Sequence, residues 1–220
     1  MTAAMKEKLV LHPGMAGALL TPREFDAADW DGEGEIYELI NGVLVVSPPP
    51  LEEERDPNGE LEYLLRGYQR QHPQGKALNK TLAQQRVRAG RNRRIADRVI
   101  WAGLGRKPKR DEVPTIAVEF VSKDRRDWLR DYKVKKREYK AVGVKEYWII
   151  DRFCRTMTVI INEPGGSREV IVHETEIYRT PLLPGFELPL AQLLAVADDW
   201  EKQVPKRRAR RGKRRPKRGA

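Results

Sequence analysis

The chain has 220 residues, of which 40% are hydrophobic and 34% are charged. This is enough apolar material to bury one sizeable core, and nothing requires a second domain. The single cysteine, Cys154, excludes an intramolecular disulfide and a cysteine-rich zinc site, and it fits a reducing cytoplasm. No apolar run reaches the roughly 20 residues that a membrane span needs. We therefore expect one cytoplasmic globular domain without a membrane segment.

The basic character of the chain is concentrated at its C-terminus. The formal charge is +11, and residues 202–220 hold eleven Lys and Arg with no acid, which leaves 32 basic against 32 acidic residues in positions 1–201. No apolar side chain could anchor this segment to a core, so we expect a disordered basic tail over residues 201–220. Such a tail can bind nucleic acid through its phosphates without reading sequence. A solubilising end with no specific partner is the alternative.

Local patterns predict a mixed α/β order of elements after a flexible N-terminal arm over residues 1–20. Asn41-Gly42 is the strongest hairpin signal, because both turn residues tolerate positive φ. Thr21-Pro22 supplies an N-cap and a proline at the first helical position. The predicted elements are helix 21–29, strands 36–40 and 43–47, helix 56–72, strands 84–88, 94–101 and 115–121, helix 128–142, strands 147–150, 156–161 and 169–173, and helix 190–200.

The middle of the chain reads strand, strand, helix, strand. This order favours a mixed β-sheet with a right-handed crossover and helices on its faces. We therefore expect a single domain over residues 21–200, beginning with the N-terminal hairpin and followed by the basic tail.

One lysine interrupts the apolar stripe of the helix predicted at 128–142. Trp128, Tyr132, Lys135, Tyr139 and Val142 fall on one narrow face of a helix with a 3.6-residue repeat. A buried ammonium is costly unless it is paired. We therefore expect Lys135 to point toward carboxylates from neighbouring strands.

Two acids stand where strand alternation predicts hydrophobic residues. Asp97 shares a strand face with Val99, and Glu119 shares one with Ala117 and Val121. These acids and the lysine could form a satisfied buried ion-pair network, or the carboxylates could lie in solvent at strand ends. They also suit phosphodiester hydrolysis. Carboxylate oxygens are hard ligands for Mg²⁺ or Mn²⁺, and a lysine can stabilise developing charge or position the attacking water.

Several motifs are spread over the predicted domain: YELING at 37–42, SPP at 47–49, Asp97, VEFVS at 118–122, Asp131, Lys135, Tyr139 and GVKEYWIID at 143–151. Over about residues 21–190 the chain resembles the Uma2 family (formerly DUF820) of restriction-endonuclease-like proteins. The resemblance implies the PD-(D/E)xK nuclease fold, a four- or five-stranded mixed sheet flanked by helices, together with a divalent metal.

The resemblance also implies roles for three residues. Asp97 corresponds to the motif aspartate, although Ala96 precedes it where proline is usual, and Glu119 corresponds to the second acid. Both would hold Mg²⁺ or Mn²⁺. The superfamily's usual lysine two positions after the second acid is Val121 here, and the resemblance implies that Lys135 replaces it from the helix.

Three further residues are weaker candidates. Glu54 and Glu60 could add a carboxylate from the preceding helix, or they could simply be solvated at its end. Lys123, just past the strand, is a rival for the catalytic lysine.

The leading hypothesis is a metal-dependent endonuclease that hydrolyses DNA. A non-catalytic nucleic-acid-binding protein on a nuclease-like scaffold is the alternative. A partner-binding module is a third hypothesis, and a homodimer would allow cleavage of both strands.

Overall fold

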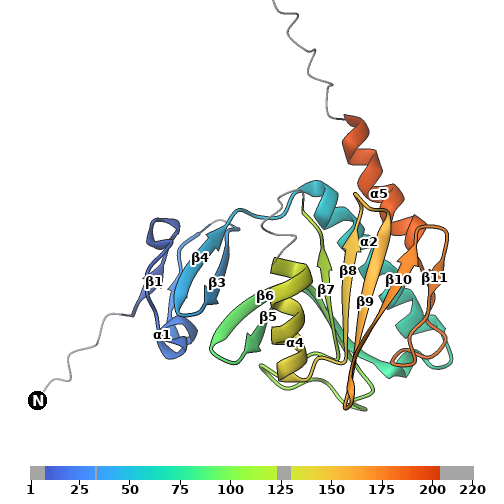
Figure 1. Cartoon of the computed structure of the whole chain (residues 1–220), viewed down its shortest axis with the longest axis horizontal. Helices are drawn as coiled ribbons and strands as arrows, with labels where there is room; N and C mark the ends of the chain where they lie inside the picture. Colours follow the sequence, from blue (N-terminus) through green and yellow to red (C-terminus); the bar gives the residue numbers. More distant parts are fainter. Residues whose placement is uncertain (1–7, 33, 123–129, 204–220) are drawn as a thin grey trace, which may run out of the picture.

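The computed structural model describes residues 8–32, 34–122 and 130–203, and its centre is an eight-stranded mixed sheet (Figure 1). Seven strands follow the order β10-β9-β8-β7-β6-β3-β4, and β5 pairs with β6 beside this path. The strands are β3 (Ile36–Ile40), β4 (Val43–Ser47), β5 (Leu78–Ala89), β6 (Asn92–Ala102), β7 (Ile116–Phe120), β8 (Glu146–Asp151), β9 (Thr156–Glu163) and β10 (Gly166–His173).

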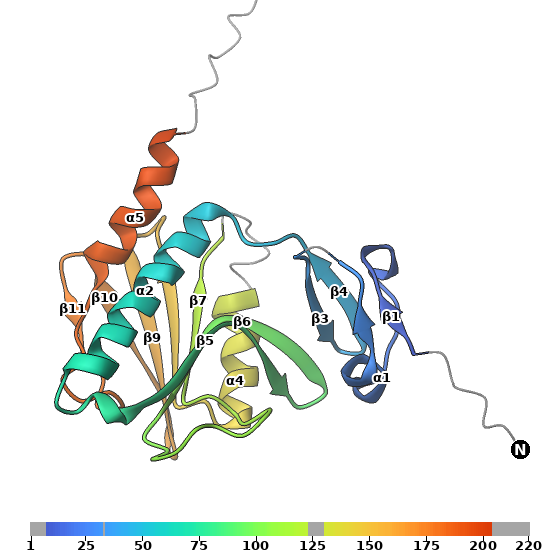
Figure 2. The same cartoon turned by 180° about the vertical axis from the view of Figure 1, so that it is seen from behind.

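Helices cover both faces of the sheet, as Figures 1 and 2 show from opposite sides. Helices α2 (Glu52–Gln71) and α5 (Leu190–Gln203) pack together on one face. The other face carries the crossover between the parallel strands β7 and β8, which consists of a π-helical turn, η3 (Arg130–Lys135), and α4 (Lys136–Val142). The predicted mixed sheet with flanking helices is confirmed.

Alternation along β7 divides the interior into two apolar cores. Ile116, Val118 and Phe120 join the core beneath α2 and α5, whereas Ala117 joins the core beneath α4. Both faces of this strand are buried, as expected for a strand next to a parallel neighbour with helices on either side. Glu119 therefore stands in a fully apolar strand, on the α4 side.

The first residues of the described chain build a small cluster beside the hairpin β3–β4. Here β1 (Val10–Leu11) pairs with β2 (Asp29–Trp30), and α1 (Pro22–Ala27) lies between them in the chain. Leu11 and Phe25 are completely buried in this cluster. The expectation of a flexible arm over residues 1–20 is thus wrong for residues 8–20, because Leu11 gains an apolar pocket that local sequence could not reveal.

Several element boundaries follow from local chemistry. Thr21 forms the expected capping box with Glu24, and the hairpin has the predicted strand bounds. In contrast, α2 begins at Glu52, four residues before the predicted start, so that Pro57 lies inside it. Three acids in the first turn favour this earlier start, because they complement the positive end of the helix dipole.

The remaining elements are short. They are η1 (Pro13–Met15), η2 (Gly75–Ala77), β11 (Ile177–Tyr178) and β12 (Leu188–Pro189). Within the described ranges, no helix has the length and apolarity that crossing a membrane requires. The predictions for Trp128, for Lys123 and for the basic tail beyond Gln203 fall outside the described residues.

Candidate active site

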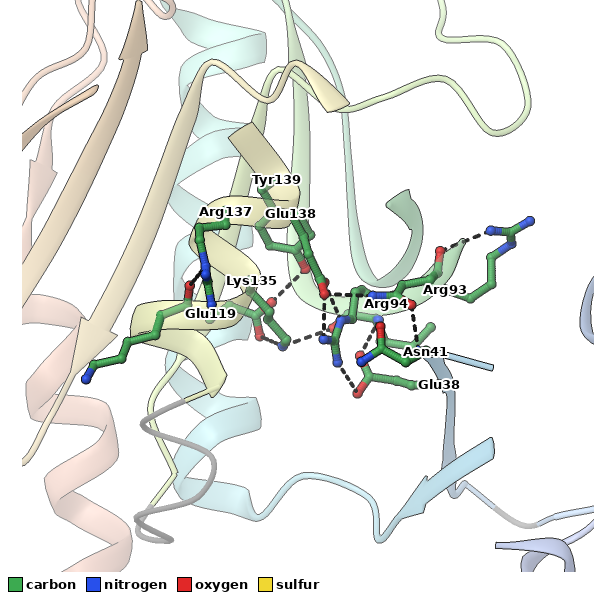
Figure 3. A network of polar contacts seen from close by, with 12 residues as sticks. Glu38, Asn41, Arg93, Arg94, Glu119, Lys135, Arg137, Glu138 and Tyr139 are labelled. Atoms are coloured by element: carbon green, nitrogen blue, oxygen red, sulfur yellow. Dashed lines mark hydrogen bonds and ion pairs between the residues drawn. The ribbon is translucent and has the colours of Figure 1, made fainter. Parts of the chain in front are cut away.

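Lys135 is buried against a carboxylate. Its Nζ lies 2.7 Å from Oε2 of Glu119, and each of the two side chains is only 3% exposed. The other oxygen of Glu119 accepts a hydrogen bond of 3.0 Å from the Tyr139 hydroxyl (Figure 3). Lys135 also donates to the backbone carbonyl of Ile95 at 3.4 Å. The structure therefore pairs the core-facing lysine with one of its two expected partners.

The helix that carries Lys135 changes its winding at this residue. The turn from Arg130 to Lys135 is π-helical, and the α-helix begins at the next residue. A π turn inserts an extra residue into a helix and is frequent at functional sites. Lys135 and Tyr139, four residues apart across this junction, both reach Glu119.

Asp97 lies beside Glu119 where the pairing of β6 and β7 ends. The last recorded pair toward this end is Arg98 with Val118, so 97 and 119 are the next opposing positions. The Asp97 carboxylate continues the ladder, because its Oδ2 accepts the backbone N–H of Phe120 at 2.7 Å. Asp97 is half-buried, whereas Glu119 is enclosed. Of these two acids, Glu119 is therefore shielded from solvent and Asp97 is partly exposed to it.

A third carboxylate, Glu54, approaches Asp97 from the first turn of α2. Burial and the negative charge of Asp97 raise the pKa of Glu54 to about 7, against an ordinary value of 4.5. The backbone N–H of Leu51 donates to Glu54 at 3.2 Å and offsets part of this rise. Glu54 also lines a small cavity of about 10 Å³, room for about one water molecule, together with Val121 and Arg152.

The solvated interpretation of Glu54 is therefore wrong, since the residue is half-buried within the electrostatic reach of Asp97. The earlier start of α2 explains the error, because a Glu54 in a loop would not be held toward the sheet. Glu60 differs, since it accepts a hydrogen bond from Gln192 of α5.

These acids fit a divalent cation. Two carboxylates that repel one another, as Glu54 and Asp97 do, favour a cation between or beside them. The described residues contain no group of three or more Asp, Glu, His or Cys arranged around a common point. Mg²⁺ is nevertheless commonly held by one or two carboxylates, with water completing its coordination.

A second buried network links the N-terminal hairpin to Lys135. Arg94 is 1% exposed, and its guanidinium lies 2.6 Å from Glu138 of α4 and 3.8 Å from Glu38 of β3 (Figure 3). Burial alone would lower the pKa of Arg94, but its bond to Glu138 and the charge of Glu38 outweigh it and raise the pKa. Glu38 also accepts the N–H of Ile95 at 2.9 Å. The backbone of one residue, Ile95, thus contacts Glu38 through its N–H and Lys135 through its carbonyl.

Arg98 fixes Asp97 from the opposite face of the sheet. Its guanidinium binds the Asn58 side chain at 2.6 Å and Glu62 at 2.8 Å, both on α2. Asn58 in turn donates to the Asp97 carbonyl at 2.9 Å. Sequence reasoning did not identify Arg98 or Asn58, and the only signal for Arg98 was a charged residue next to Asp97.

Comparison with known proteins gives a family and a fold. A family model described as "Uma2: Putative restriction endonuclease" matches residues 22–191. The structure is similar to the crystal structure of a "putative nuclease belonging to DUF820" from Anabaena variabilis, with a TM-score of 0.63 and 13% sequence identity over 81% of this chain and 99% of that chain. No curated protein matches the sequence.

Proposed function

Since the chain belongs to the Uma2 family, we propose that it is a metal-dependent nuclease that hydrolyses phosphodiester bonds of DNA. The observation that supports this proposal most is the contact of Lys135 with Glu119, at a strand position adjacent to Asp97. A buried lysine is costly to maintain, and as a purely stabilising device an ion pair gains little over apolar residues. A role in chemistry would account for its retention.

Asp97 and Glu119 are the proposed ligands of Mg²⁺ or Mn²⁺, with Glu54 as a further acid on the solvent side. A bound divalent cation would lower the pKa of a water molecule and offset charge on the scissile phosphate. In this arrangement Oδ2 of Asp97 would still accept the hydrogen bond from the Phe120 N–H, and Oδ1 would bind the metal ion.

Lys135 is proposed to stabilise the charge that develops on the phosphate or to orient the attacking water. Its ammonium is held by Glu119 and the Ile95 carbonyl, so its position is fixed before substrate binds. Preorganised charge in a water-poor site contributes more than the same charge in solvent. Tyr139 would hold Glu119 in the orientation that presents it to Lys135.

Supercoiled plasmid incubated with Mg²⁺ or Mn²⁺ tests the proposal. We expect nicked or linear products from the wild type, and a loss of about 10²- to 10³-fold in rate for Lys135→Met. Asp97→Asn and Glu119→Gln should also lose cleavage. Glu163→Gln, on an exposed ion pair at the end of β9, serves as the matched control and should cleave normally. Cleavage that persists unchanged in Asp97→Asn and Glu119→Gln would reject this assignment of the site.

A non-catalytic nucleic-acid-binding function is the second candidate. It is favoured by the enclosure of Lys135 and Glu119, and by Val121 at the usual lysine position. The same assay separates the two, because a binding protein would shift plasmid mobility without any metal-dependent product.

A further inference from the structure

A groove of about 610 Å³ lies between strands β5 and β6 and the loop that joins β6 to β7. The strands contribute Lys80 and Ile95 to its lining, and the loop contributes the run Lys107–Glu112. Ile95 is shared with the candidate active site, because its carbonyl accepts the hydrogen bond from Lys135. The groove and the candidate active site therefore meet at Ile95.

The acids of the groove are already neutralised. Glu112 accepts two hydrogen bonds from the guanidinium of Arg106, at 2.7 and 2.8 Å. This bond and the Lys109 backbone N–H lower the pKa of Glu112 to about 2. Asp111 pairs with Arg88 at 3.0 Å. Neither carboxylate is therefore left to repel an anion in the groove.

Most of the cations that line the groove are unpaired. Arg86 pairs with Asp26 at 3.9 Å, but Lys80, Lys107, Lys109 and Arg110 form no ion pair within the described part of the chain. Three of them lie on one short loop and are exposed. Unpaired cations along a concave surface, with paired acids between them, attract an extended polyanion.

The loop is held in place rather than hanging free. The Trp101 indole N–H donates to the Glu112 carbonyl at 3.1 Å, and the Leu104 N–H donates to the Asn79 side chain at 2.7 Å. Together with the ion pair between Asp111 and Arg88 of β5, these bonds fix the loop against β5 and β6. The ion pair between Glu112 and Arg106 lies within the loop and stabilises its conformation. A fixed loop loses little conformational entropy when its cations bind a ligand.

We propose that this groove, which we call the Lys107–Arg110 groove, binds the sugar-phosphate backbone of the nucleic acid and guides it to Lys135. This inference rests on the proposed function for its direction toward the active site. The concave shape suits a strand better than a flat membrane surface. Recognition would be independent of sequence, because lysine and arginine contacts to phosphate carry no base information.

Salt-dependent binding tests the groove separately from catalysis. The full-length protein is titrated into a fluorescein-labelled 20-base-pair DNA duplex in EDTA, which prevents metal-dependent cleavage, and fluorescence anisotropy is followed at several KCl concentrations. Each phosphate contact contributes about 0.9 to the slope of log K against log [KCl]. Lys107→Ala/Lys109→Ala/Arg110→Ala should therefore reduce the slope by about 2 to 3.

The matched control is Lys76→Ala/Lys140→Ala/Lys145→Ala, which removes the same charge from exposed lysines that do not line the groove. It should leave the slope within about 1 of the wild type. A charge-retaining Lys107→Arg/Lys109→Arg variant should bind like the wild type, and this guards against a folding defect in the alanine variant.

If the slope of log K against log [KCl] is the same in the groove variant and the control variant, the proposed role of the groove in binding is rejected. This holds whether or not the wild type cleaves plasmid. A slope that is reduced in the groove variant alone would support binding by the groove, even if the wild type does not cleave plasmid. In that case only the proposed nuclease activity would be rejected. Equal displacement of the duplex by polyglutamate of matched charge would overturn the assignment to nucleic acid.

Discussion

The contact between Lys135 and Glu119 places two full charges in an environment almost without water. Such a pair is sensitive to loss of either member, because the desolvation cost of the remaining charge is no longer offset by the partner at 2.7 Å. The two residues should consequently behave as one unit toward stability.

We expect Glu119→Gln and Lys135→Met each to lower the free energy of unfolding by about 3 to 5 kcal/mol. In the double variant, the loss of unfolding free energy should be smaller than the sum of the two single-variant losses by about 0.5 to 3 kcal/mol. Urea unfolding followed by circular dichroism measures these values. Lys133→Met, an exposed lysine two residues away, should stay within about 0.5 kcal/mol of the wild type. Strict additivity would show that the two charges do not interact as described.

Glu54 makes stability depend on pH in an unusual direction. Its pKa in the folded protein is about 7 and its ordinary value is 4.5, so the folded state holds this proton more tightly than the unfolded state. Between these values the unfolded state binds fewer protons, and the free energy of unfolding must fall as pH rises. The contribution of Glu54 is complete below the lower value and is lost through about pH 7.

Glu54→Gln should remove this part of the pH dependence. The difference in unfolding free energy between wild type and variant should therefore change between about pH 4.5 and 7 and level off above that range. Mn²⁺ should raise the melting temperature of the wild type more at pH 8 than at pH 5, since the ionised carboxylate binds the cation. A pH profile that is identical in the variant would exclude the raised pKa.

At the scale of elements, the crossover helix ends at a residue with left-handed backbone. Gly143 caps α4 with φ of +94°, and its N–H bonds back to the last turn. A side chain there would meet no neighbouring atom within 4 Å, so any penalty comes from the backbone alone. A substitution at Gly143 therefore tests how much the left-handed cap of α4 contributes to stability.

Gly143→Ala should lower the free energy of unfolding by about 1 to 2 kcal/mol, because L-residues resist the left-handed conformation. Gly59→Ala is its counterpart inside α2, where a Cβ also meets nothing within 4 Å. That change should instead raise stability by about 0.4 to 1 kcal/mol. Chemical denaturation of both variants measures the contrast, and a destabilising effect of equal size at both sites would contradict it.

The elements that local sequence predicted well are those whose signals are local. Asn41-Gly42 predicted a hairpin with the observed bounds, and the narrow apolar stripe predicted that Lys135 faces the core. Glu38 and Arg94 were missed, because their pairing depends on where β3 meets β6, at the single registered pair Leu39 with Arg93. Long-range pairing of this kind leaves no periodic trace in the sequence.

At the scale of the whole molecule, we propose two sources of phosphate affinity, which are the eleven basic residues beyond position 201 and the Lys107–Arg110 groove. They differ in one respect: the groove shares Ile95 with the candidate active site. Affinity from the groove should therefore be coupled to cleavage, whereas affinity from the tail need not be.

Deleting residues 204–220 removes ten Lys and Arg. We expect weaker DNA binding and a smaller salt slope, with plasmid cleavage retained at low KCl. A variant in which the same residues are replaced by a Gly/Ser segment controls for chain length. Gel-shift and cleavage assays run in parallel give both readouts, and complete loss of cleavage at low salt would make the tail part of the active machinery.

The contacts made by strand β6 limit where insertions and deletions can be tolerated in this protein. Three of the four positions from 94 to 97 make contacts in different directions. Arg94 binds Glu138 of α4, the Ile95 backbone contacts Glu38 and Lys135, and the Asp97 carboxylate accepts the Phe120 N–H. Inserting or deleting one residue here would turn every side chain beyond that point to the opposite face. Related chains should accordingly vary freely in length at the turn between β9 and β10, while the spacing within β6 stays fixed.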